Sequence, residues 1–149
     1  MFTMVPYVTG ATLMAEAAVP LTRPHLCGDA LDVDPSGRAT LIGGRCADCG
    51  SETFPRVPVC ASCMSENIAA QPMPRGGTLY AFSVVHIAAK KWKKPMRIGY
   101  VDLPNGARVF THLEGTDLAI GDEVEVGVGA VGEDEEGPIT SFVFRKVKR

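Results

Sequence analysis

Four cysteines in the middle of the chain have the spacing of a metal site. Two C-x-x-C pairs, Cys46/Cys49 and Cys60/Cys63, are separated by ten residues. One C-x-x-C turn directs two thiolates at the same ion, and two such turns facing each other complete a tetrahedron. The spacing therefore predicts that these four cysteines bind one structural metal ion in a small ribbon domain.

Zinc is the metal that this pattern favours. Nothing else in the sequence indicates electron transfer, although the same four sulfurs would hold iron in a rubredoxin-like site. Four protein ligands close the site, so the metal cannot activate water and is expected to fold a segment too small to have its own core. Gly50, directly after Cys49, suits the positive φ that turns backbone N–H groups towards the sulfurs.

The alternative uses of these cysteines are a redox motif and paired disulfides. A thioredoxin-type motif begins a helix within a βαβ pattern, and none is visible in the sequence. The sequence shows no signal-peptide pattern and no run of about 20 apolar residues, so we expect a cytoplasmic protein that does not enter a membrane. That reducing compartment favours metal ligation over disulfides.

The remaining ionisable residues do not form a catalytic arrangement in the sequence. The fifth cysteine, Cys27, has no histidine at a fixed spacing and is expected to be a free thiol. His25, His86 and His112 show no metal-ligand or nucleophile–base spacing, and each is expected to be structural. We therefore expect no catalytic residues in this chain.

A basic stretch is the most unusual local feature. Residues 90–97 place four lysines and Arg97 around Trp92, the only tryptophan. Two interpretations remain open: a loop that grips the phosphates of a nucleic acid or a phosphorylated cofactor, or a solvated loop whose tryptophan packs on a barrel. The formal net charge of −2 does not favour nucleic acid as a partner.

The elements that must position these residues are mainly β-strands. Alternating apolar and polar residues predict strands over 78–86, 97–103, 107–113, 123–129 and 139–147, and Asn105-Gly106 predicts a tight hairpin. Five short strands avoid exposed edges most easily by closing into a barrel, for which the OB-fold is the common solution, and an open half of a sandwich is the alternative. We expect an N-terminal helix (about 10–18) and an irregular linker (27–44) within residues 1–44, a zinc ribbon in 45–70 and the OB-fold in 71–149.

From Leu41 to the C-terminus, a series of short motifs follows in a fixed order: Leu41-Ile42-Gly43-Gly44-Arg45 before the first cysteine pair, Phe54-Pro55 between the pairs, the run from Gly76 to His86, Tyr100-Val101-Asp102-Leu103, Gly106, Ile120-Gly121-Asp122 and Phe142-x-Phe144-Arg145. The order of these features resembles the DUF35 family. Members of this family join a rubredoxin-like zinc ribbon to an OB-fold, usually behind an N-terminal helix.

The resemblance implies a role beside a catalytic partner. Family members form complexes with thiolase-superfamily proteins that make or break carbon–carbon bonds in acyl-CoA thioesters, among them acetyl-group transferases, hydroxymethylglutaryl-CoA synthase assemblies, steroid side-chain aldolases and benzoylsuccinyl-CoA thiolase. It implies a non-catalytic zinc-binding subunit of a hetero-oligomer, and the small, separately encoded subunit of a benzoylsuccinyl-CoA-type thiolase is one example that this chain fits. Lys91, Lys93, Lys94 and Arg97 then become candidates to contact CoA phosphates.

Two other functions are consistent with parts of the pattern. A nucleic-acid-binding module would need a basic groove and stacking aromatic residues on the second and third barrel strands, where Tyr100 and Phe110 lie close to Asp102, Glu114 and Asp117. An iron-based electron carrier would use the same four cysteines, and its ferric form would colour the protein red.

Overall fold

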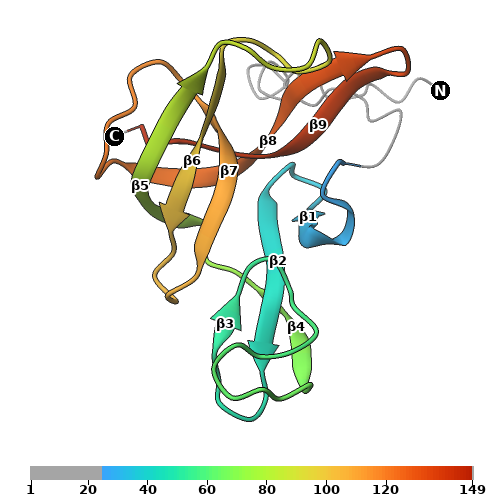
Figure 1. Cartoon of the computed structure of the whole chain (residues 1–149), viewed down its shortest axis with the longest axis vertical. Coiled ribbons are helices and arrows are strands. Elements are labelled where there is room, and N and C mark those ends of the chain that lie inside the picture. The colour runs from blue at the N-terminus through green and yellow to red at the C-terminus, as the bar shows by residue number, and fades with distance from the viewer. Residues whose placement is uncertain (1–24, 149) are drawn as a thin grey trace, which may run out of the picture.

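Residues 25–148 are described by a computed structural model, in which a small ribbon extends from a β-barrel (Figure 1). The helix expected over residues 10–18 lies outside the described residues. The described part begins with a single 3-10 turn, η3 (Gly28–Ala30). Of the helical segments in residues 25–148, none is long and apolar enough to cross a membrane.

The barrel is built from five strands, as predicted. They are β5 (Gly76–Val85), β6 (Met96–Asp102), β7 (Arg108–Glu114), β8 (Glu123–Asp134) and β9 (Gly137–Lys146). The barrel closes in the order β5-β6-β7-β9-β8, and its one parallel pairing joins β7 to β9. This is the strand arrangement of an OB-fold, because the fourth strand returns to pair with the first.

Alternation along the strands places one set of side chains inside the barrel. Leu79, Val101, Val109, Val124 and Phe144 are fully buried there. The predicted Asn-Gly turn between β6 and β7 is present: Gly106 has a φ of +88°, and the Ala107 N–H donates to Oδ1 of Asn105 at 3.2 Å.

The ribbon is a small sheet around β2 (Ala39–Cys46), which pairs with β1 (Leu31–Val33), β3 (Glu52–Thr53) and β4 (Ile68–Pro72). The prediction of an irregular linker over residues 27–44 was therefore wrong, since β1 and most of β2 lie there. Gly43 and Gly44 pair with Gln71 and Ala70 of β4 and so belong to β2. Glycine is needed at both positions, because a Cβ at 43 would collide with the Thr53 carbonyl and one at 44 with the Ile68 side chain.

Ribbon and barrel share one hydrophobic core. Leu31, Leu41 and Met73 belong to the same buried cluster as the barrel interior. Arg75 strengthens the junction, because its guanidinium donates to the carbonyls of Ala39 on β2 (2.7 Å) and Val126 on β8 (3.3 Å). These contacts couple the packing of the two parts.

The basic loop between β5 and β6 is fastened to the outside of the barrel. The Lys93 N–H donates to the Val131 carbonyl at 3.0 Å, and the Glu133 N–H donates to the Lys91 carbonyl at 2.8 Å. Trp92 packs on a second, smaller core that includes Val131. Trp92 therefore packs on the barrel, and the loop's lysines remain exposed.

Candidate metal centre

The structure brings all four predicted cysteines together. Cys46 ends β2, Cys49 lies in the turn that follows, and Cys60 and Cys63 come from the connection between β3 and β4. Their Sγ atoms all lie within 4.8 Å of one another, with Cys46 to Cys63 at 3.6 Å and Cys49 to Cys60 at 3.5 Å. Zn–S bonds of about 2.3 Å require sulfur–sulfur separations of about 3.8 Å in a tetrahedron. The four sulfurs therefore fit a tetrahedral ion.

The two cysteine turns have the same backbone hydrogen-bonding pattern. The Gly50 N–H donates to the Cys46 carbonyl, and the Met64 N–H donates to the Cys60 carbonyl, each at 2.9 Å. The first cysteine of each pair is buried and the second is exposed. Each turn therefore presents one sulfur from inside the ribbon and one from its surface, which is how two similar knuckles enclose a single ion.

Backbone N–H groups favour the thiolate form of the buried cysteines. The N–H groups of Cys63 and Ser62 lower the pKa of the Cys60 thiol to about 6, and the N–H of Cys49 lowers the pKa of Cys46. The backbone N–H of Ser65 also lowers the pKa of Cys63, but the neighbouring cysteine sulfurs oppose it and raise that pKa to about 12. Four thiolates at this separation need a cation between them, and a zinc ion would supply that charge.

A carboxylate outside the sulfur cluster ties the two knuckles together. Asp48 accepts hydrogen bonds from the Ser65 hydroxyl and from the Asn67 side-chain amide, the latter at 3.2 Å. The Ala47 N–H donates to the Asn67 carbonyl at 2.9 Å. The first knuckle is thereby fixed to the chain that follows the second, a role that the cysteine spacing alone does not reveal.

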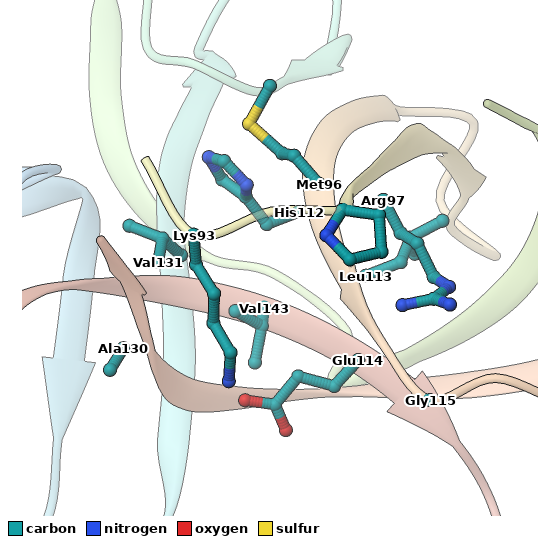
Figure 2. Close-up of a pocket in the computed structure, with 11 residues that line it drawn as sticks. Lys93, Met96, Arg97, His112, Leu113, Glu114, Gly115, Ala130, Val131 and Val143 are labelled. Atoms are coloured by element: carbon teal, nitrogen blue, oxygen red, sulfur yellow. The ribbon is translucent and has the colours of Figure 1, made fainter. Parts of the chain in front are cut away.

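The four cations proposed for CoA are not all brought together. Lys93 and Arg97 line a pocket of about 150 Å³ on the outside of the barrel, together with His112 and Glu114 (Figure 2). The Nζ atom of Lys91 instead lies 5.0 Å from the centre of the Trp92 ring. Lys94 is exposed and does not line the pocket.

Aromatic side chains are exposed on the neighbouring sheet face. Tyr100 on β6 and Phe110 on β7 are cross-strand partners, and their ring centroids lie 5.2 Å apart. Tyr80 on β5 is exposed beside them and carries the Arg108 guanidinium at 3.6 Å from its ring centre. The pairing of β5 with β6 shifts by one residue between Leu79 and Ala81, and Tyr80 lies at this bulge. The alternating sequence pattern does not indicate a bulge, so the sequence did not predict that Tyr80 joins this exposed aromatic group.

A ribbon with four converging thiols, packed on a five-stranded OB barrel, defines a zinc-ribbon/OB-fold protein. Two family models agree: residues 38–69 match the ChsH2 rubredoxin-like zinc ribbon domain, and residues 70–129 match the ChsH2 C-terminal OB-fold domain. The ribbon carries a structural zinc site on this evidence together with the geometry of the four sulfurs.

Comparisons with individual proteins extend over both domains. The chain is 40% identical over 123 residues to the benzoylsuccinyl-CoA thiolase subunit BbsA of Thauera aromatica, covering 80% of this chain and 85% of that protein. It is 34% identical over 114 residues to a DUF35 domain-containing scaffold protein of Methanocaldococcus jannaschii, covering 72% and 81%. The solved Ltp2-ChsH2(DUF35) aldolase contains a similar chain, with a TM-score of 0.60, 28% identity and coverage of 72% and 84%. This chain belongs to the DUF35 family.

Proposed function

We propose that this chain is a non-catalytic, zinc-binding accessory subunit of a thiolase-type complex that makes or cleaves carbon–carbon bonds in acyl-CoA thioesters. The observation that carries the proposal is the 40% identity to a benzoylsuccinyl-CoA thiolase subunit, which extends over 80% of this chain. The resemblance to a chain of an aldolase complex points the same way. The partner in this hetero-oligomer is a thiolase-fold catalytic subunit.

The distribution of reactive groups supports a role without catalysis. Four of the five cysteines gather at a site whose four ligands leave no position for water or substrate. Cys27 is partly buried against the hydrophobic core. His112, the histidine at the pocket, stacks beside Trp92 with ring centroids 6.0 Å apart. The nucleophile and the general base therefore belong to the partner.

The zinc has a structural role in this account. The ribbon is too small to fold on a core of its own, and its strand β2 runs from the barrel to the metal end (Figure 1). Because Leu41 on that strand packs in the barrel core, an ordered ribbon is held in one orientation on the barrel. The metal thus fixes the shape that the partner subunit binds.

The acyl-CoA substrate is expected to contact this subunit through its phosphates. Of the four candidates Lys91, Lys93, Lys94 and Arg97, we expect the two that border one pocket, Lys93 and Arg97, to make that contact. Charged hydrogen bonds from Lys and Arg to phosphate oxygens are among the stronger polar contacts that a protein surface makes.

Purification of the tagged chain from its native source tests this function. We expect a thiolase-fold protein to co-purify in a fixed ratio and the complex to survive gel filtration. A matched control is the Cys60→Ser chain, which should lose the ordered ribbon. Less of the partner should co-purify with it than with the wild-type chain. A chain that always elutes alone, with zinc bound, would remove the proposal.

A second candidate, a nucleic-acid-binding module, is favoured by one observation. Tyr100 and Phe110 are 44% and 54% exposed on the strands that bind oligonucleotides in other OB-folds. The net charge of −2 opposes it, and the Arg108 cation beside these rings is already paired with Asp102. Binding of single-stranded oligonucleotides that weakens steeply with salt would establish this alternative.

A further inference from the structure

The outer face of β6 and β7 leads directly from exposed aromatic rings to the pocket. Tyr100 pairs with Phe110, and the next outward-facing pair along the same strands is Ile98 with His112. Two residues along a strand span about 7 Å, so the pocket begins about that far from the two rings. His112 lines the pocket, which makes the rings and the pocket one continuous surface.

The aromatic end of this surface suits a planar ring. The Tyr100 and Phe110 rings are tilted by 52° and remain about half exposed, so both keep surface available for a third ring. Arg108, two residues before Phe110 on β7, is paired with a carboxylate: it donates two hydrogen bonds to Asp102, of 2.6 and 3.0 Å. Its charge is therefore compensated, and this end of the face recognises shape more than charge.

The pocket end suits phosphate groups. In Figure 2, Lys93 and Arg97 stand on different sides of the pocket, and the Lys93 side chain extends towards the Glu114 carboxylate. Glu114 forms an ion pair with Arg145 at 3.0 Å, which compensates its negative charge. The two remaining cations leave the pocket with an excess of positive charge. A volume of about 150 Å³ holds a phosphate group but not a whole nucleotide.

We propose that this face binds the adenosine 3′,5′-bisphosphate end of CoA, with the adenine against Tyr100 and Phe110 and one of its phosphates between Lys93 and Arg97. The inference rests on the proposed function for the presence of an acyl-CoA. It adds the two aromatic residues to the residues expected to contact CoA. It also limits the phosphate contacts of the loop to Lys93 and Arg97, because Lys91 lies over the Trp92 ring and Lys94 lies outside the pocket.

Calorimetric titration of the full-length zinc-loaded chain with CoA and with adenosine 3′,5′-bisphosphate tests the assignment. Lys93→Ala and Phe110→Ala should each weaken binding about tenfold, since each removes either a charged phosphate contact or a stacked ring. The matched controls are Lys94→Ala, the adjacent lysine of the same loop, and Phe110→Tyr, which keeps the ring. Both should bind like the wild type. Glu114→Gln should bind more tightly, because it frees Arg145 from its carboxylate partner and so adds to the positive charge at the pocket.

The proposal is overturned if the wild-type chain binds neither compound, or if Lys93→Ala and Lys94→Ala lose the same affinity. Tighter binding of a single-stranded oligonucleotide through Tyr100 and Phe110 would also overturn it and assign the face to nucleic acid. Chemical-shift mapping of the wild-type chain with adenosine 3′,5′-bisphosphate gives the same answer without substitutions: shifts must concentrate at Phe110, His112 and Lys93. A chain that assembles with its catalytic partner but never binds CoA would remove this inference and leave the proposed function standing.

Discussion

Gly50 and Met64 occupy the same position in the two cysteine knuckles. Their φ angles are +77° and +65°, and each donates its N–H to the carbonyl of the first cysteine of its knuckle at 2.9 Å. Glycine adopts this left-handed conformation without steric cost, whereas a residue with a Cβ does not. The second knuckle is therefore held in a strained conformation that the first avoids.

Met64→Gly is expected to stabilise the zinc-loaded protein. The substitution relieves the left-handed strain, and the net gain in free energy of unfolding should be about 0.5–1 kcal/mol, after the greater freedom of glycine in the unfolded chain is counted. Urea denaturation measures it. Met64→Ala is the matched control, because it shortens the exposed side chain but keeps the Cβ. Equal stabilities of the Gly and Ala variants would show that the strain is absent.

Cys60→Ser is expected to abolish metal binding and to weaken the barrel as well. Zinc content should fall from about one ion per chain towards zero, because a hydroxyl does not replace a thiolate ligand. Since Leu41 and Met73 of the ribbon side pack in the barrel core, loss of the ribbon should lower the midpoint of thermal unfolding of the whole chain. Cys27→Ser is the control and should keep its zinc. Full zinc occupancy in the Cys60→Ser chain would contradict the assigned ligand set.

Glu52 is expected to make the junction between ribbon and barrel sensitive to acid. Its carboxylate accepts a hydrogen bond from the Asn105 amide at 2.6 Å and pairs with Arg45 at 3.0 Å, and these contacts lower its pKa. A carboxyl whose pKa is lower in the folded state stabilises the fold above its ordinary pKa and loses that contribution as the pH falls through the folded value. Glu52→Gln should therefore be less stable than the wild type at pH 7.

Denaturation at a series of pH values checks the Glu52 prediction. The difference between the wild type and Glu52→Gln should shrink below the ordinary pKa of 4.5 and disappear at still lower pH. Salt should reduce the part that depends on Arg45. A difference that is constant from pH 7 to pH 3 would mean that the ionised carboxylate contributes nothing.

Gly132→Ala is expected to displace the basic loop. A Cβ at this position would collide with the Lys91 carbonyl, which is backbone and cannot rotate away. The cost should be about 1–3 kcal/mol of stability, and the fluorescence of Trp92 should change because its contacts with the second core are disturbed. Gly76→Ala is the control, since its Cβ would meet only an ordinary contact at 3.7 Å. Identical spectra and stability for both variants would disprove the close fit.

Much of the barrel was predictable because its strands follow a period of two. The sequence indicated all five strands, and the Asn105-Gly106 turn was correctly located. What was missed lies where glycine replaces the alternating residues. β2 begins in a segment rich in turn-forming residues, and β8 runs to Asp134 through Gly129 and Gly132, which make room for Glu114 and for the Lys91 backbone. Those close approaches are tertiary contacts, which a local sequence pattern does not predict.

The sulfur cluster was predictable for a different reason. Four cysteines in two C-x-x-C pairs indicate a metal site from sequence alone, because tetrahedral coordination of one ion requires this spacing. The supporting carboxylate of Asp48 and the left-handed Met64 have no such signature. Of the four loop cations, the sequence could not tell which ones converge, since Trp92 and the Lys93–Val131 hydrogen bond decide how the loop lies.

Reconstitution with the catalytic partner tests the central claim most directly. The thiolase-fold subunit that co-purifies would be assayed for cleavage of its acyl-CoA substrate alone, with this chain, and with the Cys60→Ser chain, while gel filtration reports the assembly. We predict that this chain alone has no activity, that it forms a stoichiometric complex with the catalytic subunit and raises its activity, and that the Cys60→Ser chain does neither. Substrate turnover by this chain alone, or a catalytic subunit that neither binds it nor responds to it, would contradict the account.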